Sequence, residues 1–134
     1  GVVLEAHEKF LLVISYNPGY QSALKDLKHS TRQRFMALEF TYPDRETETT
    51  IIEHESGVNT EMATSLAKLG EKVRNLREHG LQEGVSTRLL VHTGKLIAKG
   101  VPPRRACQVA VVWALTDEEQ VQRSVEEVIS SIFA

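Results

Sequence analysis

The sequence has 134 residues, enough for one ordinary domain, with 16 basic and 18 acidic residues and a net charge of -2. Proteins that bind nucleic acid usually carry a clear excess of basic residues. The slightly negative net charge therefore gives no electrostatic reason to expect nucleic acid as a partner. No apolar run approaches the ~18 residues of a membrane span, and the single cysteine, Cys107, excludes an intrachain disulfide and a cysteine-based zinc site.

The first 43 residues have the pattern of strands and turns. Residues 10–15 (FLLVIS) are apolar at successive positions, which is typical of a strand buried on both faces, and an Asn-Pro-Gly turn follows them. A short helix is expected over residues 25–34, and a second strand over residues 36–42 that ends at Pro43. Residues 1–43 are therefore predicted to be an α/β fragment, with strands of a parallel sheet.

Residues 44–134 instead contain the start and end signals of helices. Helix starts are expected at Asp44, Asn59, Ser86, Pro102 and Thr116, and helix ends at Gly57, Gly80 and Gly100. Apolar stripes at spacings of three and four comprise Met62, Leu66, Leu69, Val73 and Leu76 in one helix and Val121, Val125, Val128 and Ile132 in the last. Thr116 and Glu119 have the spacing of a capping box. The sequence therefore predicts a four- or five-helix bundle over residues 44–134.

Four polar residues are candidates for a phosphate site. Asn17 follows the first expected strand, and ligands of open α/β sheets bind at that end; a plain turn is the alternative. Arg32 and Arg34 have the planar fork that suits phosphate, with a solvated basic surface as the alternative. Arg88 is expected in the first turn of a helix, where the helix dipole disfavours a cation and favours an anionic partner. Its alternative is an exposed arginine without a role.

Metal sites receive no support from the sequence. The five histidines show no i,i+4 pair and no ligand spacing, and Thr93-Gly94-Lys95 lacks the Ser/Thr and the first glycine of a phosphate loop. Cys107 lies among apolar residues and is interpreted as a small core residue.

Several stretches together resemble one family. They are VISYNPGYQSALKDLKHSTRQRF, EFTYP, HESGV, HGLQEGVSTRLLV, LIAKGV and LTD, in this order along essentially the whole chain. They resemble the CbbQ/NirQ/NorQ branch of AAA+ ATPases, which is related to the MoxR group. The resemblance implies that residues 1–43 are the C-terminal part of the α/β core and residues 44–134 the helical lid.

The resemblance also implies a role for each candidate. Asn17 matches the first sensor, which orients the attacking water, and Arg34, or alternatively Arg32, matches the arginine finger that reaches the neighbouring subunit's nucleotide. Arg88 matches the second sensor, which contacts the subunit's own nucleotide from the lid. A finger of this kind can accelerate phosphoryl transfer by ~10³-fold or more.

The sequence departs from the family at its front. No G-x-x-x-x-G-K-[ST] motif occurs, and no apolar strand ending in paired acids for magnesium is found. We therefore expect these 134 residues to be a portion of a longer chain, and by themselves to lack ATPase activity. ATP and Mg²⁺ are the implied cofactors, bound mainly by the part that precedes these residues.

The implied function is a hexameric ATPase that remodels a client enzyme together with a von Willebrand-type adaptor protein of the CbbO or NorD kind. One branch resembles Rubisco activases, which release inhibitory sugar phosphates; the other supports maturation of nitric oxide reductase. Residues 25–28 and 54–58 resemble the Rubisco-activating branch more closely. The implied location is cytoplasmic, with carboxysomes as one site of association, and neither nucleic acid nor membrane insertion is expected. A non-catalytic helical interaction module is the alternative class.

Overall fold

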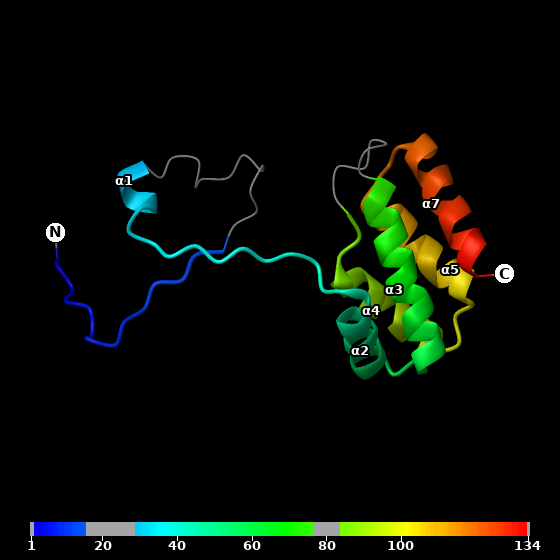
Figure 1. Cartoon of the computed structure of the whole chain (residues 1–134), viewed down its shortest axis with the longest axis horizontal. Helices are drawn as coiled ribbons and strands as arrows, with labels where there is room; N and C mark the ends of the chain where they lie inside the picture. Colours follow the sequence, from blue (N-terminus) through cyan, green and yellow to red (C-terminus); the bar gives the residue numbers. More distant parts are fainter. Residues whose placement is uncertain (1, 16–28, 77–83, 134) are drawn as a thin grey trace. The chain divides into compact units, whose positions relative to one another are not determined.

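The computed structural model describes residues 2–15, 29–76 and 84–133 (Figure 1). Contacts between residues divide the chain into two units, Gly1–Glu39 and Phe40–Ala134. Each unit is described by itself. The candidate site belongs to the second.

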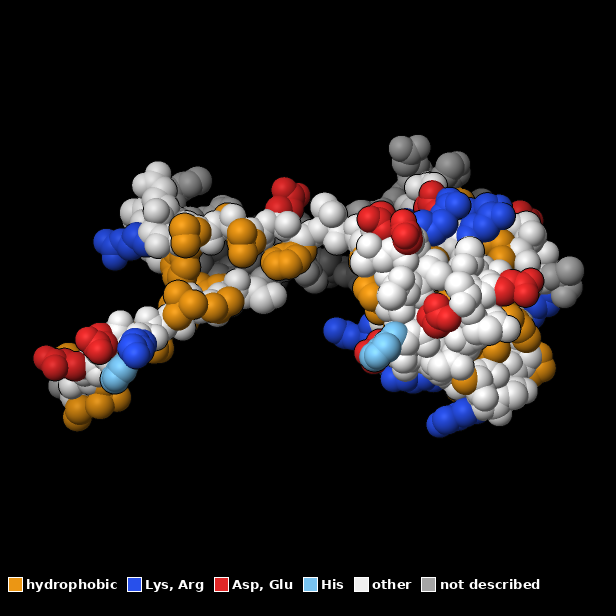
Figure 2. Space-filling model, turned by 60° about the horizontal axis from the view of Figure 1, so that its bottom comes forward, with side chains coloured by type: hydrophobic (Ala, Val, Ile, Leu, Met, Phe, Trp, Pro, Cys, Tyr) orange, Lys and Arg blue, Asp and Glu red, His pale blue; other side chains and the backbone are white. Residues whose placement is uncertain are grey.

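The first unit contains one short helix, α1 (His29–Arg32), in its described residues. Residues 10–15 form no β-strand, and neither does any other segment of residues 2–15 and 29–39. Their apolar side chains are exposed: Leu11 is 80% and Val13 is 78% accessible to solvent. Figure 2 shows such side chains in orange along this unit.

The prediction of an α/β fragment over residues 1–43 is therefore wrong for the described residues. A strand is held by backbone hydrogen bonds to a neighbouring strand, and no such ladder is present in residues 2–15 and 29–43. The second expected strand, residues 36–42, is likewise extended without pairing. Of the helix expected over residues 25–34, His29–Arg32 is helical and residues 25–28 lie outside the described part.

The second unit is an all-helical bundle, as the sequence predicts for this region (Figure 1). Its elements are α2 (Arg45–Ser56), α3 (Thr60–Arg74), α4 (Thr87–Ala98), α5 (Pro103–Cys107), the π-helix η3 (Gln108–Val112), α6 (Trp113–Leu115) and α7 (Glu119–Ile132). Helix α2 packs on α3 and α4, α3 also packs on α4 and α7, and α5 and η3 contact both α4 and α7. None of the described helices is long and apolar enough to cross a membrane.

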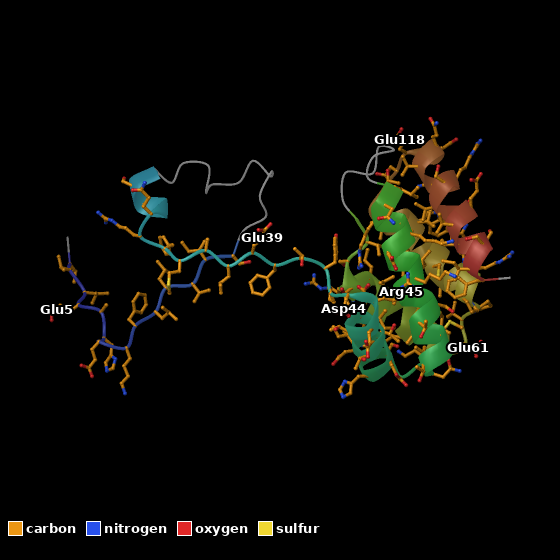
Figure 3. The ribbon with its side chains drawn as sticks, in the orientation of Figure 1. Glu5, Glu39, Asp44, Arg45, Glu61 and Glu118 are labelled. Carbon is orange, nitrogen blue, oxygen red and sulfur yellow. The ribbon has the colours of Figure 1, made fainter. Side chains whose placement is uncertain are left out.

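Three of the predicted N-caps are confirmed, because each side chain accepts a hydrogen bond from the backbone three residues later. The bonds run from Thr47 N to Asp44 Oδ1 (2.8 Å), Met62 N to Asn59 Oδ1 (2.9 Å) and Leu89 N to Ser86 Oγ (3.3 Å). Figure 3 marks Asp44 and Arg45 at the beginning of α2. The backbone N–H of Thr47 stabilises the charged carboxylate and lowers the pKa of Asp44. At the other end, Gly57 has φ 78° and closes α2, as predicted.

The expected start of the last helix at Thr116 is wrong. Helix α7 begins at Glu119, and its N-cap is Glu118, which makes no side-chain cap bond. The Thr116 hydroxyl accepts from the Glu118 N–H (3.1 Å), two residues on, so it closes a local turn and not a capping box. The backbone of Thr116 is extended and belongs to the end of α6.

The predicted apolar stripes supply part of the core of the bundle. Buried stripe residues are Leu66, Leu69, Val73, Val121 and Val125, whereas Met62, Leu76, Val128 and Ile132 are only partly buried and pack against the core. The fully buried aliphatic side chains of the core include Ile52, Leu66, Leu69, Val73, Leu90, Val111, Val112 and Val125. Cys107 is also fully buried, which confirms its interpretation as a core residue. Burial disfavours the thiolate and raises the pKa of Cys107 to about 12.

Helices α2 and α4 approach closely at Gly94. A Cβ placed there would lie 2.5 Å from the Oγ and 2.7 Å from the Cβ of Ser56. In an exposed helix, replacing glycine with alanine stabilises by ~1 kcal/mol. Here contact with Ser56 reverses the sign, because the two helices must move apart to admit one methyl group.

Gly94→Ala is therefore expected to lower the free energy of unfolding by roughly 1–3 kcal/mol, the usual penalty of overpacking. Chemical denaturation followed by circular dichroism measures it. Lys95→Ala, on the exposed side of the same helix, is the control and should leave the midpoint nearly unchanged. A stabilised Gly94→Ala variant would contradict the close packing of α2 on α4.

Candidate functional site at the start of α4

Arg88 lies in the first turn of α4, two residues after the Ser86 N-cap. Its side chain is exposed, and it makes no side-chain hydrogen bond or ion pair with the described residues of the chain. The backbone N–H groups of a first helical turn and the positive end of the helix dipole surround such a position with donors and positive potential. This end of α4 is therefore suited to an anion, which would also relieve the unfavourable placement of the Arg88 charge.

A buried ion pair lies behind this exposed end. Arg74, the last residue of α3, donates from Nη1 to Glu48 Oε2 (2.8 Å) and from Nη2 to Glu48 Oε1 (2.7 Å). Glu48 belongs to α2, and the two side chains are only 2% (Glu48) and 10% (Arg74) exposed. The two parallel bonds of this fork fix both groups in one orientation and join α2 to α3.

Glu48 and Arg74 also hold the segment that leads into α4. The Thr87 hydroxyl donates to Glu48 Oε1 (2.7 Å), and Arg74 Nε donates to the Val85 carbonyl (2.8 Å). Val85 is fully buried. The turn that precedes Arg88 is thus held on both sides of Ser86 by residues of α2 and α3.

Tyr42 covers the guanidinium of Arg74. Its ring centroid lies 3.9 Å from the Arg74 Cζ, and its hydroxyl donates to the Gly84 carbonyl (3.3 Å). An added Cβ at Gly84 would lie 3.0 Å from the Arg74 Cγ and 3.1 Å from the Tyr42 hydroxyl, so either side chain would have to shift by a few tenths of an ångström. The cluster of Tyr42, Glu48, Arg74 and Thr87, called here the anchor cluster, is therefore closely packed.

The other candidates from the sequence belong to the first unit. Asn17 lies outside the described residues. Arg32 is the last residue of α1. Arg34 is exposed in the turn that follows, where its backbone N–H donates to the Thr31 carbonyl (3.1 Å). The structure does not test their assignments, so the roles of Asn17, Arg32 and Arg34 stay predictions.

The anchor cluster was not found from the sequence. Glu48 lies in an acidic stretch, where it looks like its neighbours Glu46 and Glu53. One signal was present: Glu48 precedes the buried Ile52 by four residues and so shares the inward face of α2. Its partner Arg74 is 26 residues away, and no local pattern connects them.

A second polar feature is a pocket between α5 and α7, and hydrogen bonds join several of its lining residues to one another. It is lined by Arg104, Arg105, Gln108, Glu126, Ile129 and Ser130. Gln108 of the π-helix donates to Glu126 Oε1 (3.2 Å) and accepts from Arg105 Nη1 (2.5 Å). Arg104 Nε donates to the Phe133 carbonyl (2.6 Å). The bonds of Gln108 to Glu126 and of Arg104 to Phe133 join η3 and α5 to α7 and its C-terminal end.

Comparison with known proteins gives one consistent result. The family model "CbbQ/NirQ/NorQ C-terminal" matches residues 48–132. The chain is 49% identical over 134 residues to Protein CbbQ of Hydrogenophilus thermoluteolus, which covers all of this chain and 50% of that protein. It is 45% identical over 129 residues to the denitrification regulatory protein NirQ of Pseudomonas aeruginosa, covering 96% of this chain and 50% of that protein. For Protein NorQ of Paracoccus denitrificans the identity is 44% over 133 residues, covering 99% and 49%.

The helical bundle, in which the anchor cluster holds the first turn of α4 with Arg88, thus belongs to a known class of helical C-terminal domain. The chain is a member of the CbbQ/NirQ/NorQ family, and residues 48–132 contain the family's C-terminal domain. The chain spans about half the length of the curated relatives it matches.

Proposed function

We propose that this chain is the C-terminal half of an ATP-hydrolysing AAA+ motor that remodels a client enzyme. In this proposal the bundle over residues 44–134 is the lid, Arg88 contacts the bound nucleotide, and residues 1–43 supply Asn17 and the arginine finger. The observation that carries the proposal is the exposed Arg88 at an anchored helix start in a domain of this family. An anion there would receive charge-assisted hydrogen bonds.

The proposed assembly is a homo-oligomeric ring, with six subunits as the expected number and a cytoplasmic location that includes carboxysomes. A ring is required because the finger, Arg34 or Arg32, would act on the nucleotide of the neighbouring subunit. No group of three or more His, Cys, Asp and Glu side chains that could hold a metal gathers in residues 2–15, 29–76 and 84–133. In this proposal ATP and Mg²⁺ are bound mainly by the half of the relatives that this chain does not span.

Rubisco is the proposed client, reached through a von Willebrand-type adaptor protein. The identity to Protein CbbQ, at 49%, exceeds that to NirQ and NorQ, at 45% and 44%, which favours the CbbQ branch by a small margin. The alternative client, supported by almost the same identities, is nitric oxide reductase during its maturation.

The test uses the full-length protein, meaning the complete polypeptide that contains this chain, with its adaptor, ATP and sugar-phosphate-inhibited Rubisco. Carboxylation is expected to recover. Arg88→Ala should raise the KM for ATP about 10- to 100-fold, because hydrogen bonds between charged groups contribute ~1.5–3 kcal/mol. At limiting ATP the recovery should fall accordingly.

Lys95→Ala is the matched control, since it removes an exposed cation from the same helix without touching its first turn. Absence of recovery with the wild-type protein would count against Rubisco as the client. Tight ATP binding by the isolated 134-residue chain would contradict the proposed division of the nucleotide site, and failure of the full-length protein to bind or hydrolyse ATP would favour the interaction module.

A further inference from the structure

The anchor cluster holds the backbone immediately before Arg88 at two points. The Thr87 hydroxyl is bound to Glu48 Oε1 at 2.7 Å, and the Val85 carbonyl is bound to Arg74 Nε at 2.8 Å. We infer that Glu48, Arg74 and Thr87 are positioning residues that set the direction of Arg88 toward the nucleotide. This inference rests on the proposed function, in which Arg88 is the nucleotide contact of the lid.

The anchor can perform this role because it belongs to other helices. Glu48 comes from α2 and Arg74 from α3, and both helices are capped at their first turns and packed into the core. The start of α4 is therefore fixed by the rigid part of the bundle and not only by its own N-cap bond, which is 3.3 Å long. An arginine that must meet a phosphate depends on such fixing, because displacements of about 1 Å can reduce rates by ~10²-fold.

The chemistry of the cluster favours positioning over simple cohesion. Well-packed apolar residues commonly replace a buried ion pair with no loss of stability, so a pair of this kind is weak evidence for a stabilising role. What it supplies here is direction. Glu48 Oε1 accepts from both Arg74 Nη2 and the Thr87 hydroxyl, so the position of Thr87 follows that of the fork. The Tyr42 ring lies 3.9 Å from the Arg74 Cζ, against a face of the guanidinium, and limits its movement.

A double-mutant cycle between Thr87→Val and Arg88→Ala in the full-length protein tests the inference. Valine has the shape of threonine but cannot donate to Glu48. In the wild-type background we expect Thr87→Val to raise the KM for ATP about 3- to 10-fold, less than the loss of Arg88 itself, because the contact of Arg88 is displaced and not removed. In the Arg88→Ala background the same change should alter KM less than about 2-fold, since two residues that act through one contact are not additive.

Two controls separate positioning from folding. Thr87→Ser keeps the hydroxyl and should restore KM to within about 2-fold of wild type, which a loss of helix stability would not predict. Thr64→Val removes an exposed hydroxyl that donates to the Thr60 carbonyl within α3 (2.7 Å), and should leave KM unchanged. If Thr87→Val does not fold, Glu48→Gln, which keeps the size of the side chain and weakens both bonds, takes its place in the cycle.

The outcomes distinguish this inference from the proposed function. Equal effects of Thr87→Val with and without Arg88, or no effect in the wild-type background, would overturn the positioning role while leaving the nucleotide contact intact. An unchanged KM in Arg88→Ala alone would overturn the contact itself and the inference with it. A rise of KM in Thr87→Val that occurs only when Arg88 is present supports both.

Discussion

Replacing Arg34 with alanine in the full-length protein is expected to lower the rate of ATP hydrolysis by ~10³-fold or more, the scale reported for arginine fingers. Arg34 is exposed in the turn after α1, so truncation removes a charge without opening a core. In the proposed ring its guanidinium would neutralise charge that develops in the transition state on the nucleotide of the adjacent subunit. Steady-state hydrolysis and equilibrium ATP binding, measured on the same preparation, check it.

ATP binding should remain nearly intact in Arg34→Ala, because a finger supplied by a neighbour contributes to the transition state and little to ground-state binding. Arg32→Ala is the paired variant, since it removes the alternative finger. Loss of hydrolysis in Arg32→Ala alone would transfer the assignment to Arg32. Full hydrolysis in both variants would show that this turn does not reach a nucleotide.

The second large effect concerns the stability of the bundle. Arg74→Met is expected to lower the free energy of unfolding by about 3–5 kcal/mol, because Glu48 would remain buried without its partner. Among the described residues, the Glu48 carboxylate, 2% exposed, would keep the hydrogen bond from Thr87 alone. Urea denaturation of the 134-residue chain, followed by circular dichroism at the helical band, measures the change.

A matched ion pair serves as the control for Arg74→Met. Arg45 and Glu71 also join α2 to α3, with Nη2 and Oε2 2.5 Å apart, but these side chains are 54% and 50% exposed. Arg45→Met should therefore cost less than about 1 kcal/mol. The double replacement Glu48→Leu with Arg74→Met should recover most of the stability, because it leaves no buried charge. A small effect of Arg74→Met alone would mean that water reaches Glu48.

Much of the bundle could be predicted because its signals are local. Asp44, Asn59 and Ser86 cap helices through bonds to backbone groups three residues away, and a short window of sequence contains both partners. The stripes that become the core follow the period of a helix, which any apolar face must obey. Thr116 shows the limit of this reasoning. A capping box would have its hydroxyl accept from the backbone N–H of Glu119, but it accepts from that of Glu118.

The strands predicted for residues 10–15 and 36–42 failed for a different reason. An apolar run describes what a segment can bury, but a strand also needs a second backbone at hydrogen-bonding distance. The described residues 2–15 and 29–43 provide no such ladder. The sequence also did not predict the π-helix η3. Its five residues, Gln108 to Val112, contain no helix start or stop signal that separates them from the α-helix before them.

By itself the sequence determined the family, the helical class of residues 44–134, the caps that start three of its helices, and Arg88 as a cation at the wrong end of a helix. These depend on residue identity and on spacings of a few positions. Only the tertiary structure decided how the Arg88 turn is held. Glu48, Arg74 and Thr87 are separated by 26 and 39 positions in their two pairings, and they meet only after α2, α3 and α4 have packed. A buried charge finds its partner through the fold, because desolvation makes the pairing obligatory but does not specify where in the chain the partner lies.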